Sequence, residues 1–77
     1  MTLEPDDLII EPFAAQPSPQ RGGYRVLLNG LALQCRTRAF AEATALTLAH
    51  RAGVAVFLRD PRRGLLVVGT HRQRRTH

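Results

Sequence analysis

The clearest alternation of apolar and polar side chains spans residues 24–35 and is interrupted by the dipeptide Asn29-Gly30. Asn and Gly both tolerate positive φ, as a two-residue type I′ hairpin turn requires. The opposite face of this hairpin carries polar residues such as Arg25 and Gln34, so one face suits a core and the other suits water. The turn predicts three apolar pairs on the core face: Leu28 with Leu31, Val26 with Leu33, and Tyr24 with Cys35.

Residues 38–52 follow a helical pattern, because alanine and leucine dominate the segment and both favour helix. Thr37 is a suitable N-cap, and Gly53 is placed to adopt the left-handed conformation that ends a helix. A helix with a stripe of small residues can approach a sheet closely. One side of the helical wheel carries such a stripe: Ala41, Ala45, Leu48, Ala49 and Ala52.

A second hairpin is predicted from two apolar runs, residues 54–59 and 65–70. The Asp-Pro step between them, with Gly64 at its end, favours a four-residue loop built on a type I turn. Both faces of this hairpin are apolar in the middle, and one helix covers only one face of a small sheet. We therefore expect residues 8–10 or another subunit to cover part of the second face. The predicted pairs are Leu58 with Val67, Val56 with Gly69, Phe57 with Val68, and Ala55 with Thr70.

The remaining segments complete the predicted organisation. Residues 1–13 form an acidic start and a short strand at 8–10, and Pro12 favours a sheet edge or a strand end. Residues 14–23 are a loop or linker, residues 24–70 are the ββαββ core, and residues 71–77 are a basic tail. The sequence thus predicts an α+β fold, a two-layer sandwich of hairpin, helix and hairpin with a short N-terminal strand and one helix on an antiparallel sheet.

Length and composition narrow the class of protein. Seventy-seven residues make one domain, and a hydrophobic content of 44% is too high for intrinsic disorder. The single cysteine, Cys35, has no second cysteine to pair with, and the start of the chain does not resemble a signal peptide. Together these features predict a cytoplasmic protein. No apolar run approaches the ~20 residues that a membrane span requires.

The distribution of charge along the chain indicates a class of binding partner, which the composition alone does not. The chain has eleven arginines and no lysine, and four of its six acids lie in the first eleven residues, which contain no arginine. Residues 12–77 therefore carry eleven arginines against Glu42 and Asp60. A GC-rich genome explains the choice of arginine over lysine, but it does not explain why the acids cluster. Such a positive field attracts polyanions.

Nucleic acid, DNA or RNA, is the partner that this charge distribution favours. Arginine grips phosphate with two hydrogen bonds and also contacts base edges, and a two-stranded ribbon can enter a major groove. Aromatic residues are too few for a platform that stacks single strands. The bland alternative is a solvated face that keeps a small domain soluble. The predicted contacts are Arg62, Arg63, Arg72, Arg74 and Arg75, followed by Arg25 and Arg36.

The rival interpretation is a protein-interaction module built on the second hairpin. Such a hairpin can form a homodimer, add its edge to a partner sheet or bind an acidic protein surface. Small inhibitors and accessory factors of phages and mobile elements offer an analogy of size and style alone. The residues predicted for this interface are Ala55, Phe57, Leu66 and Val68.

Nothing in the sequence predicts a catalytic, metal or cofactor site. The three histidines lack metal-ligand spacing, and Cys35 has no CxxC partner and lies on the predicted core face, where thiols are unreactive. Asp6 and Asp7 lie in a start without a rigid scaffold for acid–base chemistry. Gly22-Gly23 precedes a strand rather than the helix that a phosphate-binding loop needs. We therefore expect a protein that is not an enzyme.

Overall fold

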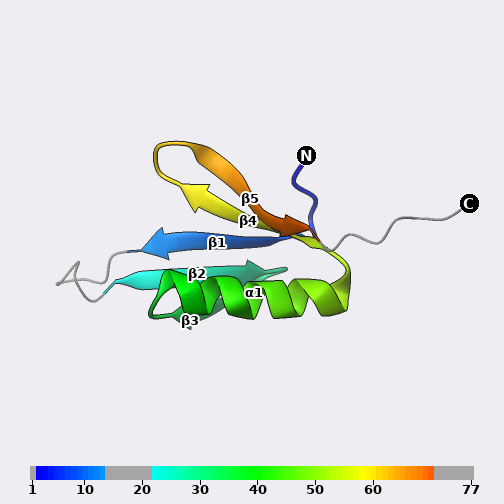
Figure 1. Cartoon of the computed structure of the whole chain (residues 1–77), viewed down its shortest axis with the longest axis horizontal. Coiled ribbons are helices and arrows are strands. Elements are labelled where there is room, and N and C mark those ends of the chain that lie inside the picture. Colours follow the sequence, from blue (N-terminus) through cyan, green and yellow to red (C-terminus); the bar gives the residue numbers. More distant parts are fainter. Residues whose placement is uncertain (1, 14–21, 71–77) are drawn as a thin grey trace, which may run out of the picture.

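The computed structural model describes residues 2–13 and 22–70, in which one helix packs on a five-stranded mixed sheet (Figure 1). This arrangement confirms the predicted α+β class with one helix on one sheet. The boundaries of the helix are as predicted. The elements in chain order are β1 Leu8–Phe13, β2 Gly23–Leu28, β3 Leu31–Cys35, α1 Arg38–Ala52, β4 Ala55–Asp60 and β5 Gly64–Thr70.

β1 is the central strand of the sheet, whose order is β3-β2-β1-β4-β5. It pairs antiparallel with β2 and parallel with β4, so the sheet is mixed and not antiparallel throughout. The prediction that residues 8–10 cover a sheet face was wrong, because these residues lie within the sheet. The pairing between β1 and β4 ends at Ile10 with Leu58, and Pro12 lies beyond this last pair, so it is tolerated in the strand. Its missing N–H therefore removes no hydrogen bond to β4.

The first hairpin, β2 and β3, has the predicted turn and register. Asn29 and Gly30 adopt φ values of 35° and 93°, as the type I′ turn requires. Val26 and Cys35 are buried on the face that the pattern assigned to the core. The predicted pairs are all present: Leu28 with Leu31, Val26 with Leu33, and Tyr24 with Cys35.

The second hairpin, β4 and β5, departs from the predicted register in the half nearer its turn, from Phe57 onward. Val68 is an extra residue there, since a β-bulge interrupts the pairing between Val56 and Phe57. The four-residue loop was also wrong: residues 61–63 form a three-residue loop that Gly64 closes at φ 78°. Ala55 pairs with Thr70 and Val56 with Gly69 as predicted, but Phe57 faces Val67 and Leu58 faces Leu66.

The helix α1 has the predicted caps and packs closely on the sheet. The Thr37 hydroxyl accepts a hydrogen bond from the Phe40 N–H at 3.1 Å, and Gly53 ends the helix at φ 69°. Small side chains on the buried side of the helix permit this approach. A Cβ atom at Gly69 of β5 would lie 2.6 Å from Leu46 of the helix, which shows how near the two layers are. The buried helix residues are Ala41, Ala45 and Ala49.

The core lies between α1 and one face of the sheet. Its largest fully buried side chains are Ile10, Val26 and Val56, which come from β1, β2 and β4. We call the other face, which α1 does not cover, the open face. Apolar residues in register cross this face from one edge strand to the other: Ala32, Leu27, Ile9, Phe57 and Val67.

Asp7 fixes the start of β1 against the start of β4. It is 5% exposed, and its Oδ1 accepts a hydrogen bond from the Ala55 N–H at 2.9 Å. Its Oδ2 accepts one from the Glu4 N–H at 2.8 Å. Asp7 thereby anchors two segments far apart in the sequence. In the part of the chain that the structure describes, no helix has both the length and the apolar character needed to cross a membrane.

Candidate nucleic-acid interface

The two ends of the sheet differ in charge. β1, β3 and β4 finish at one end, where α1 also begins and the β4–β5 hairpin turns (Figure 1). Counted over residues 2–13 and 22–70, this arginine end carries net +3, since Glu11, Glu42 and Asp60 oppose six arginines. In the same residues the acidic end has Glu4, Asp6 and Asp7 against Arg51, a net charge of −2. The residues that define the arginine end are Arg25, Arg36, Arg38, Arg59, Arg62 and Arg63.

Asp60 organises the tip of the β4–β5 hairpin. Its Oδ1 accepts hydrogen bonds from the backbone N–H groups of Arg62 and Arg63, at 2.7 and 2.8 Å. These bonds, first from Arg62 and then from Arg63, lower the pKa of Asp60, and the positive charges of Arg63 and Arg38 act in the same direction. Both tip residues are exposed, and within the described residues neither guanidinium forms an ion pair. The tip therefore presents two positive groups on an ordered turn.

An ionic row crosses the open face beside the tip. Glu11 of β1 lies between Arg25 of β2 and Arg59 of β4, with N···O distances of 3.9 and 3.7 Å. The Arg25 and Arg59 side chains remain 42% and 54% exposed, and the Arg25 Cζ lies 4.8 Å from the centre of the Phe13 ring. Such long, exposed ion pairs contribute little to stability. One carboxylate shared by two guanidinium groups leaves this row with a positive charge.

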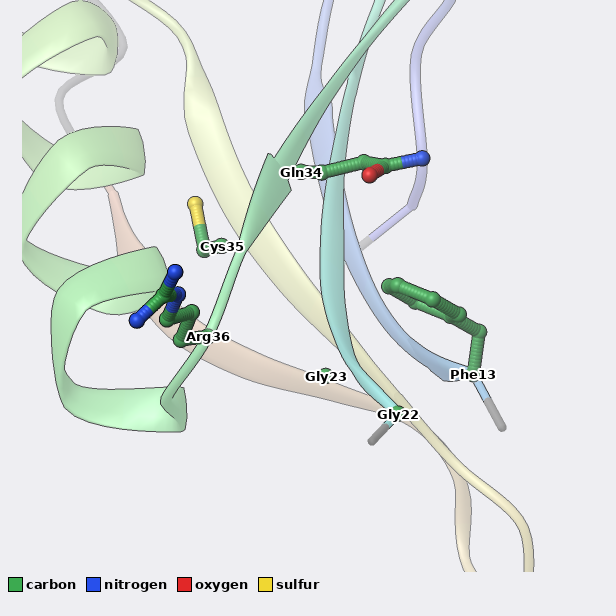
Figure 2. A pocket seen from close by; sticks show the side chains of 6 residues that line it. All are labelled: Phe13, Gly22, Gly23, Gln34, Cys35 and Arg36. Carbon is green, nitrogen blue, oxygen red and sulfur yellow. The ribbon is translucent and has the colours of Figure 1, made fainter. Parts of the chain in front are cut away.

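The start of α1 adds to the same field. Its first turn contains no acid, so the positive end of the helix dipole is not opposed there. Arg38 pairs with Glu42 at 3.1 Å, whereas Arg36 is exposed just before the helix. Beside Arg36 a hollow of about 290 Å³ opens at the start of β2 and the end of β3. Figure 2 shows that Gly22 and Gly23 add no side chain to this hollow, and that Phe13 and Gln34 lie on one side of the sheet and Cys35 and Arg36 on the other.

The structure places four of the arginines that the sequence predicted as contacts at the same end of the sheet, namely Arg25, Arg36, Arg62 and Arg63. Arg38 and Arg59 belong to the same end, and the sequence reasoning missed them. Arg59 could have been predicted from the sequence, because it directly precedes Asp60, where the turn of the second hairpin begins. The remaining predicted contacts lie outside the described residues: Arg72, Arg74 and Arg75.

The four residues predicted for a protein interface do not share one surface. Ala55 and Phe57 belong to the open face but are already buried, at 0% and 2% exposure. Leu66 and Val68 pack against the core on the helix side. The β-bulge explains why Val68 does not share a face with Phe57, because it brings Val67 opposite Phe57 instead. Within the described ranges, the exposed large apolar residues are instead Leu3, Leu31, Leu33, Phe40, Leu65 and Val67.

The described residues were also compared with what a reactive cysteine or a metal site requires. Cys35 is a free, buried cysteine in the core. In residues 2–13 and 22–70, no three side chains of His, Cys, Asp or Glu are grouped as metal ligands would be. Comparison of the chain with protein-family models, with curated proteins and with solved structures gives no match. The candidate site therefore depends on its own geometry and charge.

Proposed function

We propose that this protein binds nucleic acid through its arginine end and is not an enzyme. The observation that carries the proposal is the separation of charge along the sheet, where the described residues give net +3 at one end and −2 at the other. A polyanion attracts the first end and repels the second, so the field orients the protein as it approaches. A solvated surface that served solubility alone would not need this separation.

The β4–β5 hairpin tip is the element best suited to primary contact. It is a two-stranded ribbon, which a major groove admits, and Arg62 and Arg63 project from a turn that Asp60 holds. Arg25 and Arg59 lie on the open face beside it and can exchange the long ion pairs with Glu11 for phosphate oxygens. Arg36 and the start of α1 extend the contact to the far edge of the sheet.

The test is the salt dependence of binding to short DNA and RNA duplexes, measured by fluorescence anisotropy. We expect affinity to fall steeply as salt rises, because bound phosphates release counterions. Arg62→Ala should lower the slope of log K against log salt by about one unit. Arg51→Ala removes the same charge at the acidic end and is the matched control, which should leave the slope unchanged. Absence of binding at low salt, or equal effects of the two variants, would contradict the proposal.

The arginines of residues 71–77 belong to the same proposal. Removing these residues deletes Arg72, Arg74 and Arg75 together. If all three contact phosphate, the slope should fall by about three units. A slope that does not change would restrict the interface to the arginine end of the folded domain.

A further inference from the structure

β3 is an edge strand, and in the part of the chain that the structure describes nothing protects it from pairing. Its sequence, Leu-Ala-Leu-Gln-Cys, has no charge and no proline, and its pairing with β2 has no bulge. The other edge strand, β5, is interrupted by the bulge at Val68. Natural proteins usually protect exposed edges with charges, prolines or bulges, because an open edge pairs readily with another strand. β3 therefore has the features of an edge that is occupied in solution.

The turn fixes which backbone groups of β3 are free. Leu28 and Leu31 close a two-residue hairpin, and such a closing pair is hydrogen-bonded. Because hydrogen-bonded and non-hydrogen-bonded pairs alternate along an antiparallel ladder, Leu33 and Cys35 also direct their N–H and C=O groups toward β2. Ala32 and Gln34 direct theirs away from the sheet. The free edge thus offers two donors and two acceptors, one of each from each residue.

Exposed apolar side chains lie along the same edge, on the side of α1. Leu31 is 70% exposed and Leu33 is 41% exposed, although both belong to the core face of the hairpin. Phe40 of α1 is 62% exposed and lines a hollow of about 330 Å³ together with Cys35 and neighbouring residues. An apolar strand therefore lies next to an apolar hollow that it does not itself fill.

We propose that two copies of this chain pair antiparallel through β3, so that one sheet continues across a two-fold axis. Ala32 of one copy exchanges hydrogen bonds with the partner's Gln34, and the symmetric pair does the same. The axis then passes beside Leu33, which faces the partner's Leu33. Leu31 faces the partner's Cys35 and extends toward the hollow that Phe40 borders in the partner subunit. This inference is independent of nucleic-acid binding.

A second copy suits this edge better than an unrelated strand, for reasons of symmetry and charge. The proposed register is self-complementary, so each apolar side chain and each free backbone group meets its own counterpart. No charged side chain of β3 opposes another at the axis, although the whole protein carries net +5. Just beyond β3, Arg36 reaches the partner's Asn29-Gly30 turn. Asp6 borders the same hollow as Asn29, so opposite charges approach each other there.

Cross-linking tests the register directly. Leu33→Cys in a C35S background places a thiol opposite the same thiol of the partner in a non-hydrogen-bonded pair, at the Cα separation of about 4.5 Å that suits a disulfide. Mild oxidation should therefore give a covalent dimer that a reductant separates. The control is Leu65→Cys in the same background, which exposes a thiol on the other edge strand at a position that is also 41% exposed, and it should give none. Failure of L33C/C35S to cross-link, or equal cross-linking of the control, would overturn the register.

Oligomeric state provides a second test, with matched variants on the two edge strands. Leu33 and Leu65 are each 41% exposed, and Leu→Lys adds the same charge at either position. Leu33→Lys places two ammonium groups at the axis and should weaken the dimer on the order of 100-fold. Leu65→Lys should leave it intact. Sedimentation of the free proteins, with circular dichroism to confirm folding, measures both. A monomeric wild type, or a dimer lost only in L65K, would overturn the proposal without bearing on nucleic-acid binding.

Discussion

Asp7 connects the start of β1 to the start of β4, through hydrogen bonds to two backbone N–H groups. Asp7→Ala leaves the buried Ala55 N–H without this acceptor, and we expect the free energy of unfolding to fall by about 1–3 kcal/mol. Asp6→Ala, at the exposed neighbour, is the control and should change it by less than about 0.5 kcal/mol. Urea denaturation measures both. Similar values for the two variants would show that the hydrogen bond to Ala55 contributes little.

The role of Asp7 could not be predicted from the sequence. Its partner Ala55 is 48 residues away, and only the parallel pairing of β1 with β4 brings them together. The sequence placed Asp7 in an acidic start without a scaffold. A local pattern identifies a carboxylate, but it does not reveal a backbone N–H that arrives from a distant strand.

Asp60 makes the hairpin tip sensitive to pH. Its pKa in the folded protein is lowered from the ordinary 3.8 by the N–H groups of Arg62 and Arg63. The folded state therefore favours the ionised form, so this contribution to stability is present above pH 3.8 and is lost as pH falls through the folded pKa. We expect the denaturation midpoints of the wild type and Asp60→Ala to differ at neutral pH and to converge in acid. A difference that does not depend on pH would contradict this role of Asp60.

At the scale of elements, the small side chains of α1 set the distance between the two layers. Ala45 is fully buried against the sheet, whereas Ala43 on the same helix is exposed. Ala45→Leu forces extra volume into this contact and should lower the free energy of unfolding by about 1–3 kcal/mol. Ala43→Leu adds the same side chain toward solvent and should change it by less than about 0.5 kcal/mol. Thermal denaturation compares them. If A45L is as stable as A43L, the layers are not held by the size of these alanines.

The two hairpins show which local structures a sequence determines. Asn29-Gly30 permits one short turn, and that turn alone sets the register of β2 and β3. The Asp-Pro start and Gly64 suit loops of three or four residues equally well, so the second register depends on packing. The bulge at Val68 lies beside Gly69, where the sheet passes under Leu46 of α1. That contact is tertiary, and no pattern within β4 or β5 reveals it.

At the scale of the whole molecule, the sequence predicted the ingredients of the candidate site better than their arrangement. The clustering of acids before β1 was visible, and it became the acidic end because β1 begins there. The convergence of Arg36 and Arg38 with Arg59 was not visible. It requires that β3 and β4 finish at the same end, which follows from the central position of β1 and its parallel pairing with β4.

The proposed dimer makes a distinct prediction about binding. Since β3 of one copy runs antiparallel to the partner's β3, the two arginine ends lie at opposite ends of the continuous sheet. Each copy should therefore bind its own short duplex, with a stoichiometry of two duplexes for each dimer. Ala32→Pro keeps the charge and removes only an N–H that points toward the partner, because proline is tolerated on edge strands.

This variant should be monomeric yet retain the affinity and the salt slope for a short duplex, measured per chain by fluorescence anisotropy. The physical reason is that the pairing of the two β3 strands involves no arginine of the β4–β5 tip or of the open face; of the arginine end, only Arg36 comes near the partner. A monomeric A32P that loses affinity for short duplexes would mean that one duplex contacts both copies. The arginine end of a single copy would then not be the complete interface, and a parallel arrangement of the two copies would replace the antiparallel one.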